Sequence, residues 1–164
     1  MDLSTYSLEE LLLTALKSEE ESNTIYTKLA NLVKNGLLKD KLFYLAKEEN
    51  KHKTYIKSLF KRQFPNKPIL IPEKTSVPLP EITMPDESIP LSNIIQQAMT
   101  AEKAAQEFYH SLAKRYNNNQ QIQHTLTYFA DMELGHYKIL EVEKASMERF
   151  EAADVYWPMV HIGP

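Results

Sequence analysis

The sequence carries the same pattern of acidic, aromatic and imidazole residues twice, and this duplication limits the folds that the chain can adopt. In each copy a glutamate is followed seven residues later by a tyrosine, and about thirty residues after the glutamate comes a Glu-x-x-His pair. The first copy is Glu19, Tyr26, Glu49 and His52, and the second is Glu102, Tyr109, Glu133 and His136. Residues three apart lie on one face of an α-helix. The pattern therefore indicates two similar pairs of helices that present the same polar groups.

Apolar residues surround each copy in steps of three and four, which is the spacing of one helix face. Four such faces run between Leu8 and Val33, Leu38 and Leu59, Leu91 and Tyr116, and Ile122 and Met147. All six Glu and His residues of the pattern fall on these faces. The sequence therefore predicts that they lie in the core.

The turn signals divide the chain into four helices at about 7–35, 37–62, 90–116 and 120–147. Ser7 and Glu10 form a capping box at the first start. Gly36 is expected to end the first helix, because glycine adopts the left-handed conformation without strain. A short turn at residues 117–119 separates the last two helices. We therefore predict an all-α four-helix bundle made of two antiparallel hairpins, in a single domain over residues 1–164.

Residues 63–89 and 148–164 are the segments outside the predicted helices. The first, together with Pro90 directly after it, holds seven of the nine prolines, which disfavour helix, so it is predicted to be an extended crossover along the bundle. The alternative is a flexible linker between two separate hairpins. It is disfavoured because neither hairpin could bury its polar face alone. The second segment, with Trp157 and Pro158, is expected to form a short turn of helix and then an extended tail over the bundle.

The composition removes several classes of protein from consideration. Because the chain has no cysteine, it has no disulfide, no cysteine-bound iron–sulfur centre and no zinc finger. A net charge of −3 gives no electrostatic footprint for nucleic acid or for an anionic membrane. The N-terminus is acidic where a secretion signal would be basic, and its apolar run is too short to span a bilayer. We therefore expect a cytoplasmic protein with no nucleic-acid or membrane partner.

Four carboxylates inside a bundle need positive charge nearby, because even one unpaired buried ion costs several kcal/mol. No lysine or arginine lies on the four predicted core faces. Two divalent cations would balance the carboxylates, and two neutral imidazoles would complete the ligand set. Such a set suits iron or manganese, and zinc less selectively. The predicted metal ligands are therefore Glu19, Glu49, His52, Glu102, Glu133 and His136, with two iron ions as the predicted cofactor and manganese or zinc as alternatives.

The spacing also suggests separate roles within the site. Each Glu-x-x-His pair can offer one oxygen and one nitrogen to neighbouring points, while the lone glutamates Glu19 and Glu102 can bridge both metals. Tyr26 and Tyr109 are the candidate catalytic residues, as phenols that hydrogen-bond a ligand carboxylate. The alternative is that both are ordinary core aromatics.

Small residues one turn from the lone glutamates, Ser22 and Ala105, leave room for metals and for a small molecule such as dioxygen or peroxide. The other acidic residues and histidines fall outside the pattern. Those expected on solvated faces are Glu20, Glu21, Glu48, Glu107, Asp131 and Glu141. Glu143 is on a core face but lies ten residues past Glu133, too far to share the site. The histidines without a partner pattern are His110, His124 and His161.

Over residues 7–147 these features resemble the ferritin-like di-iron carboxylate proteins, and within them the rubrerythrins and bacterioferritins. That superfamily places one Glu on each of two helices and a Glu-x-x-His motif on each of the other two. The resemblance implies a ferritin-like bundle in which Glu19 and Glu102 are bridging or terminal ligands and the two Glu-x-x-His pairs complete the di-iron site.

The sequence departs from these relatives in three ways. Rubrerythrins usually end in a rubredoxin domain with four cysteines, and this chain has none, so the resemblance implies an external electron donor. Ala105 stands where many rubrerythrins have a further glutamate, which argues against a metal shift during turnover. The short ligand spacing and the proline-containing tail argue against the cage of storage ferritins.

The predicted function is a di-iron carboxylate oxidoreductase that reduces peroxide or dioxygen with electrons from an external redox protein. The alternatives are a ferroxidase that handles iron, a metal-stabilised helical module without enzymatic activity and, less favoured, a manganese catalase. A homo-oligomer, most simply a dimer, is expected because hairpins joined by a long crossover can exchange between chains.

Overall fold

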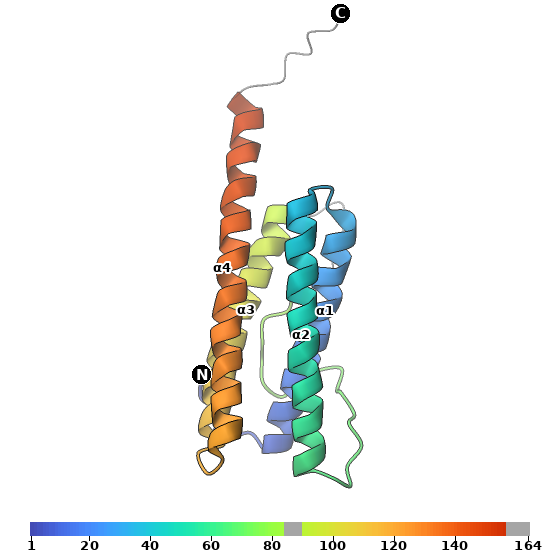
Figure 1. Ribbon diagram of the computed structural model, residues 1–164, viewed down its shortest axis with the longest axis vertical. Coiled ribbons are helices and arrows are strands. Elements are labelled where there is room, and N and C mark those ends of the chain that lie inside the picture. Colours follow the sequence, from blue (N-terminus) through green and yellow to red (C-terminus); the bar gives the residue numbers. More distant parts are fainter. Residues whose placement is uncertain (84–89, 157–164) are drawn as a thin grey trace, which may run out of the picture.

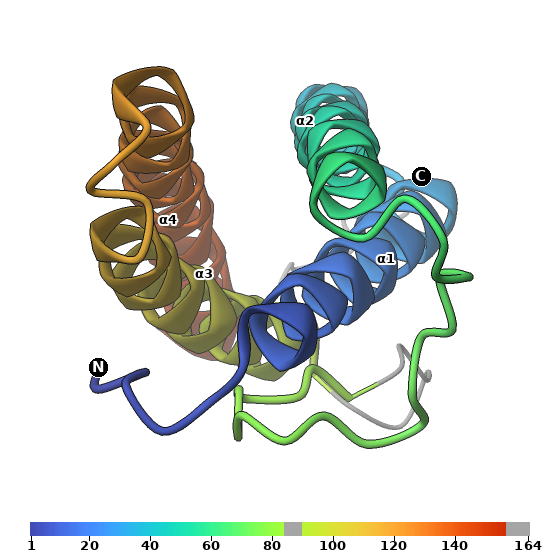
Figure 2. The same cartoon turned by 90° about the horizontal axis from the view of Figure 1, so that it is seen from below.

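The structure is a computed structural model that describes residues 1–83 and 90–156, with side-chain surroundings up to residue 149. The described residues form four helices and no strand: α1 (Leu8–Leu32), α2 (Gly36–Gln63), α3 (Leu91–Lys114) and α4 (Gln120–Tyr156). The helices pair as the hairpins α1–α2 and α3–α4, which pack together as a four-helix bundle (Figures 1 and 2). The predicted fold class is confirmed.

The start of α1 has the predicted capping box. The Ser7 hydroxyl accepts the Glu10 backbone N–H at 3.2 Å, and the Glu10 carboxylate accepts the Ser7 backbone N–H at 2.9 Å. These bonds satisfy backbone donors that the first turn of a helix leaves free. They also lower the pKa of the Glu10 carboxyl, because the hydrogen bonds from Ser7 favour its charged form.

The first hairpin turn differs from the predicted glycine stop. α1 ends at Leu32, Gly36 is the first residue of α2, and no described glycine has a positive φ. The reason is that Asn35 caps α2, since its side chain accepts the Leu38 backbone N–H at 3.1 Å. Asn119 caps α4 in the same way through Ile122. The second helix of each hairpin therefore begins with an asparagine cap.

The apolar core has two parts, one toward each end of the bundle. Both draw on all four helices, and the polar residues of the repeated pattern lie between them. Members of the first part include Leu12, Leu59, Leu112 and Leu126, and members of the second include Leu29, Leu42, Ile95 and Leu140. The polar cluster is therefore closed off by hydrophobic layers above and below.

α2 and α3 run in the same direction, and the described part of the chain between them, up to residue 83, returns along the bundle (Figure 1). It passes outside α1 and α3 (Figure 2). Val77 from this segment is 2% exposed and belongs to the first part of the core, and the Lys17 ammonium donates to the Glu73 carbonyl at 2.7 Å. The described part of the segment therefore packs on the bundle, as predicted for a crossover rather than a free linker.

α4 is longer than the sequence predicted, because it continues past residue 147 to Tyr156 and projects beyond the other helices (Figure 1). Residues 148–156 contain no glycine or proline to stop it. The extended tail that the sequence predicts falls on residues 157–164, which lie outside the described residues. None of the described helices combines the length and hydrophobicity needed to cross a bilayer.

Replacing Ser7 with alanine should destabilise the protein by about 1 kcal/mol, because it removes the side-chain acceptor for the first turn of α1. Urea unfolding followed by circular dichroism measures this change. Ser4→Ala is the control, since Ser4 is exposed and lies before α1, outside its capping box. Equal stabilities of the two variants would show that the capping box does not hold α1.

Candidate metal centre

The six predicted ligands lie together at mid-bundle, between the two parts of the core. Glu19 comes from α1, Glu102 from α3, and one Glu-x-x-His pair each from α2 and α4. Every one of the six is at most 3% exposed. Their ligand atoms form two overlapping groups in which the atoms lie within 4.8 Å of one another: Glu19, Glu49, His52 and Glu133 in one, and Glu49, Glu102, Glu133 and His136 in the other. The helices therefore bring all six residues to one place.

Glu49 and Glu133 belong to both groups. The Nδ1 atom of His52 lies 3.5 Å from Glu49 and 3.0 Å from Glu133, and the Nδ1 atom of His136 lies 3.2 Å and 3.1 Å from the same two carboxylates. The two carboxylates common to both groups thus lie on α2 and α4, whose Glu-x-x-His pairs face each other. The bridging role expected for Glu19 and Glu102 stays a prediction.

The two tyrosines connect the hairpins. The Tyr26 hydroxyl of α1 donates to Glu102 of α3, and the Tyr109 hydroxyl of α3 donates to Glu19 of α1. Burial, and then the charge of the partner glutamate, raises the pKa of each phenol well above its ordinary value, so both stay protonated donors. Each phenol thus positions a candidate ligand of the opposite hairpin. Their part in a reaction stays a prediction.

The four carboxyl groups fall into two kinds. Burial, and then the charge of Glu49, raises the pKa of Glu19 and of Glu102 well above the ordinary value. Burial acts in the same direction on Glu49 and Glu133, but their contacts with the two histidines outweigh it and lower both pKa values. The shared carboxylates therefore hold their negative charge more strongly than the outer pair.

The histidines balance that charge. Burial alone would lower the pKa of His52, but the facing carboxylates, Glu133 foremost, raise it to about 12. The pKa of His136 is also raised well above its ordinary value, by Glu102, Glu133 and Glu49. Two imidazolium groups opposite two carboxylates leave the cluster close to neutral. Metal binding here has to displace these protons, because a ligand histidine is neutral.

Several oxygen and nitrogen atoms of the cluster that could bind a metal have no hydrogen-bond partner among the described residues, although all are buried. These atoms are Glu19 Oε2, Glu49 Oε1, His52 Nδ1, Glu133 Oε1 and His136 Nε2. His52 Nδ1 and Glu133 Oε1 are only 3.0 Å apart but are not oriented for a hydrogen bond. Buried polar atoms are normally satisfied. Unsatisfied oxygen and nitrogen donors at these spacings fit a pair of divalent cations.

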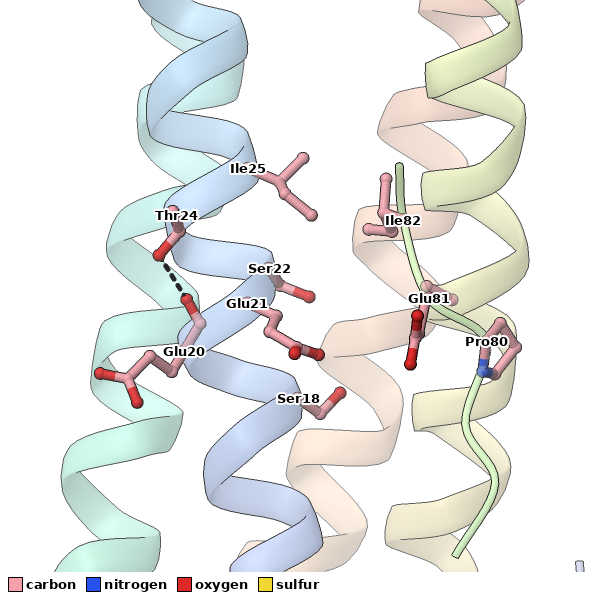
Figure 3. Close-up of a pocket in the computed structure, with 10 residues that line it drawn as sticks. Ser18, Glu20, Glu21, Ser22, Thr24, Ile25, Pro80, Glu81 and Ile82 are labelled. Carbon is pink, nitrogen blue, oxygen red and sulfur yellow. Dashed lines mark hydrogen bonds between the residues drawn. The ribbon is translucent and has the colours of Figure 1, made fainter. Parts of the chain in front are cut away.

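A cavity of about 220 Å³ lies between α1, α3 and the crossover, and its lining includes none of the six candidate ligands. Figure 3 shows Ser18, Ser22 and Glu21 of α1 facing the crossover at residues 80–82. Ser18 and Ala101, which also line it, are chain neighbours of the ligands of α1 and α3. Ser22 lines this cavity and Ala105 does not, and the room that both were expected to leave at the metal cluster stays a prediction.

The sequence analysis missed some surroundings of the site. Glu48, expected on a solvated face, is only 7% exposed and pairs with Lys51 one turn further on. Phe129 was placed on a core face, but its ring contact with His52, with centroids 4.2 Å apart, crosses between helices and has no signal in a single sequence. Other residues set aside do lie away from the cluster: Glu20, Glu21, Glu107, Asp131, Glu141, His110 and His124 are exposed, and Glu143 pairs with Lys41. His161 lies outside the described residues.

The bundle and its buried cluster of four carboxylates and two imidazoles define a ferritin-like protein with a site compatible with two metals. The rubrerythrin family model matches residues 10–144, which include all six candidate ligands and both tyrosines. The chain belongs to the rubrerythrin family. A hypothetical protein from Pyrococcus furiosus has a similar structure, with a TM-score of 0.83 and 32% identity over 91% of this chain and 95% of that chain. No curated protein sequence matches this chain.

Replacing both shared carboxylates, as in Glu49→Ala with Glu133→Ala, should abolish high-affinity metal binding. We expect about two Co²⁺ ions per chain in the parent protein, by analogy with the di-metal bundles, and fewer than about one in the variant. Absorption titration with Co²⁺ under anaerobic conditions measures both. Glu141→Ala with Glu143→Ala removes two carboxylates of α4 outside the cluster and is the matched control. Unchanged binding in the first variant would mean that the ligands are assigned wrongly.

Tyr26→Phe should weaken metal binding by about 10- to 100-fold, because it removes the hydrogen bond that orients Glu102. Tyr109→Phe should act equally on the Glu19 side. Competition with a calibrated chelator gives the affinities. Tyr116→Phe is the control, since the Tyr116 hydroxyl is buried without a hydrogen-bond partner among the described residues. If all three variants bind alike, the phenols are only core aromatics.

Proposed function

We propose that this protein is a di-iron oxidoreductase that reduces peroxide or dioxygen with electrons from an external redox protein. The observation that carries the proposal is the pair of overlapping ligand groups that share Glu49 and Glu133. An oxygen-rich set with one imidazole in each group suits iron. Membership of the rubrerythrin family supports a redox-active metal pair.

Two bound iron ions would supply the electrons that reduce the oxidant. The chain's own part is to hold them and to control their surroundings. Glu49 and Glu133 keep the two groups of ligands together, while the phenols of Tyr26 and Tyr109 fix the outer glutamates. The apolar layers on both sides exclude bulk water, which strengthens every electrostatic interaction inside the site.

The oxidant is proposed to approach through the cavity between α1, α3 and the crossover. Its lining includes the hydroxyls of Ser18 and Ser22, which can hydrogen-bond a peroxide, and Ser18 and Ala101 adjoin the ligands Glu19 and Glu102 in the chain.

The electron donor is proposed to be a separate protein, because the sequence has no cysteine to bind an iron–sulfur centre of its own. We also propose a homodimer, since two hairpins joined by a long crossover can exchange between chains. The cytoplasmic location expected from the sequence stays a prediction.

Anaerobic reconstitution with Fe²⁺ followed by peroxide tests this function. We expect loading near two irons per chain, loss of about one peroxide per iron pair because each peroxide takes two electrons, and the near-ultraviolet absorption of ferric iron. Peroxide that is left unreduced by the iron-loaded protein contradicts the proposal.

Two further measurements distinguish the competing functions. Iron that accumulates in a large hollow particle, detected by solution mass, indicates iron storage by a ferroxidase instead. Zinc in the native protein, together with no oxygen consumption on addition of Fe²⁺, indicates a metal-stabilised helical module. Disproportionation of peroxide by the manganese-loaded protein, with no external reductant, indicates a catalase.

A further inference from the structure

A stack of aromatic rings leads from one candidate ligand to the surface of α2. The His52 ring packs against Phe129 with centroids 4.2 Å apart, and Phe129 meets Tyr55 edge-on at 5.2 Å. The Arg62 guanidinium lies 5.9 Å from the centre of the Tyr55 ring. Phe129 is buried and Tyr55 is half-buried. Contiguous rings thus connect the metal cluster with a half-buried tyrosine and a surface arginine.

Among the described residues, no such stack leads from His136. The register of the two Glu-x-x-His pairs makes Leu45 the equivalent of Phe129, and Ile139 the equivalent of Tyr55. His136 therefore has aliphatic residues at the positions where His52 has aromatic ones. The two halves are alike in their ligands and different in what connects those ligands to the surface.

The surface above the stack is basic, in a chain that is acidic overall. Eight basic residues lie on α2, against three acidic ones, of which Glu49 belongs to the buried cluster: Lys39, Lys41, Lys47, Lys51, Lys53, Lys57, Lys61 and Arg62 against Asp40, Glu48 and Glu49. Lys57, Lys61 and Arg62 line a shallow hollow with Thr54 and Ser58. None of these three cations forms an ion pair with a described residue. The equivalent positions on α4 are Glu141, Ala145 and Ser146.

We propose that this surface, from Thr54 to Arg62, docks an acidic one-electron carrier protein, and that electrons enter through Tyr55, Phe129 and His52. The inference rests on the proposed function and names the partner's charge and its place of contact. Each transfer oxidises the carrier by one electron and reduces one ferric ion to ferrous, so two transfers restore a di-iron(II) pair. No other co-reactant is needed.

An acidic protein fits this surface better than other anions. Cations spaced over two turns of one helix match a patch of carboxylates, and long-range attraction between opposite patches speeds the encounter of two proteins. A polyanion such as nucleic acid would use the charge but not the aromatic stack beneath it. The stack favours a partner that delivers electrons.

The docking surface is tested with the zinc-loaded protein, which is redox-silent, and a small acidic [2Fe–2S] ferredoxin as the probe. Nuclear magnetic resonance should show the largest shifts at residues 54–62. Lys57→Glu with Lys61→Glu should weaken binding at least about tenfold at low salt, and rising salt should weaken the parent complex. Lys103→Glu with Lys114→Glu makes the same charge change on α3 and should leave binding within about twofold. Shifts elsewhere, or equal binding of poly-glutamate, overturn the proposal.

The electron path is tested by the rate at which the same ferredoxin reduces the ferric protein, divided by the rate with dithionite. Phe129→Leu and Tyr55→Leu should each lower this ratio severalfold, because they interrupt the stack. Phe60→Leu removes a buried ring of α2 outside the stack and is the matched control. Because Tyr55 is only half-buried, we expect Tyr55→Leu to fold. The test therefore stays decisive even if Phe129→Leu does not fold. An unchanged ratio for Tyr55→Leu overturns the path.

Failure of this inference is distinguishable from failure of the proposed function. Iron loading and peroxide reduction in a single turnover need no carrier. If both occur while the ferredoxin leaves α2 unshifted, the docking surface is wrong and the di-iron function stands. If peroxide is not reduced, the proposed function fails whatever the ferredoxin binds.

Discussion

Charge in the interior is the constraint on which this structure depends. Four carboxyl groups at most 3% exposed cannot all be ionised without compensation, because desolvation of each charge is costly. The side chains compensate one another: contacts with His52 and His136 lower the pKa of Glu49 and Glu133, whereas burial raises the pKa of Glu19 and Glu102. Two divalent cations with four carboxylates and neutral imidazoles give the same balance. The cluster therefore has a neutral arrangement with protons and another with metals.

The cluster also explains why the two hairpins are one unit. Each ligand group takes three residues from one hairpin and one glutamate from the other, and each hairpin places a tyrosine on a glutamate of the other: Tyr26 on Glu102 and Tyr109 on Glu19. Hydrogen bonds between buried groups are strong in a low dielectric and costly to leave unmade. Apolar layers drawn from all four helices lie on both sides of these contacts. Polar and apolar contacts thus favour the same packing.

The duplicated pattern is symmetric at the ligands and asymmetric around them. His52 stacks on Phe129, whereas Leu45 stands at the equivalent position in the other half. α2 is basic and its counterpart α4 is not. The shared ligand set accounts for a metal pair, and the difference between the halves provides a direction for electron entry in the proposed function.

The four helices, their pairing and the six buried Glu and His residues were predictable from the sequence, because helical period and motif spacing are local properties. It misjudged Gly36, since an asparagine cap at Asn35 and a glycine stop compete for the same turn. Only the tertiary structure decided that Glu49 and Glu133 are the shared carboxylates, that each tyrosine binds the opposite hairpin, and that Phe129 covers His52. These contacts depend on the relative rotation and offset of helices from different hairpins, which no spacing within one helix encodes.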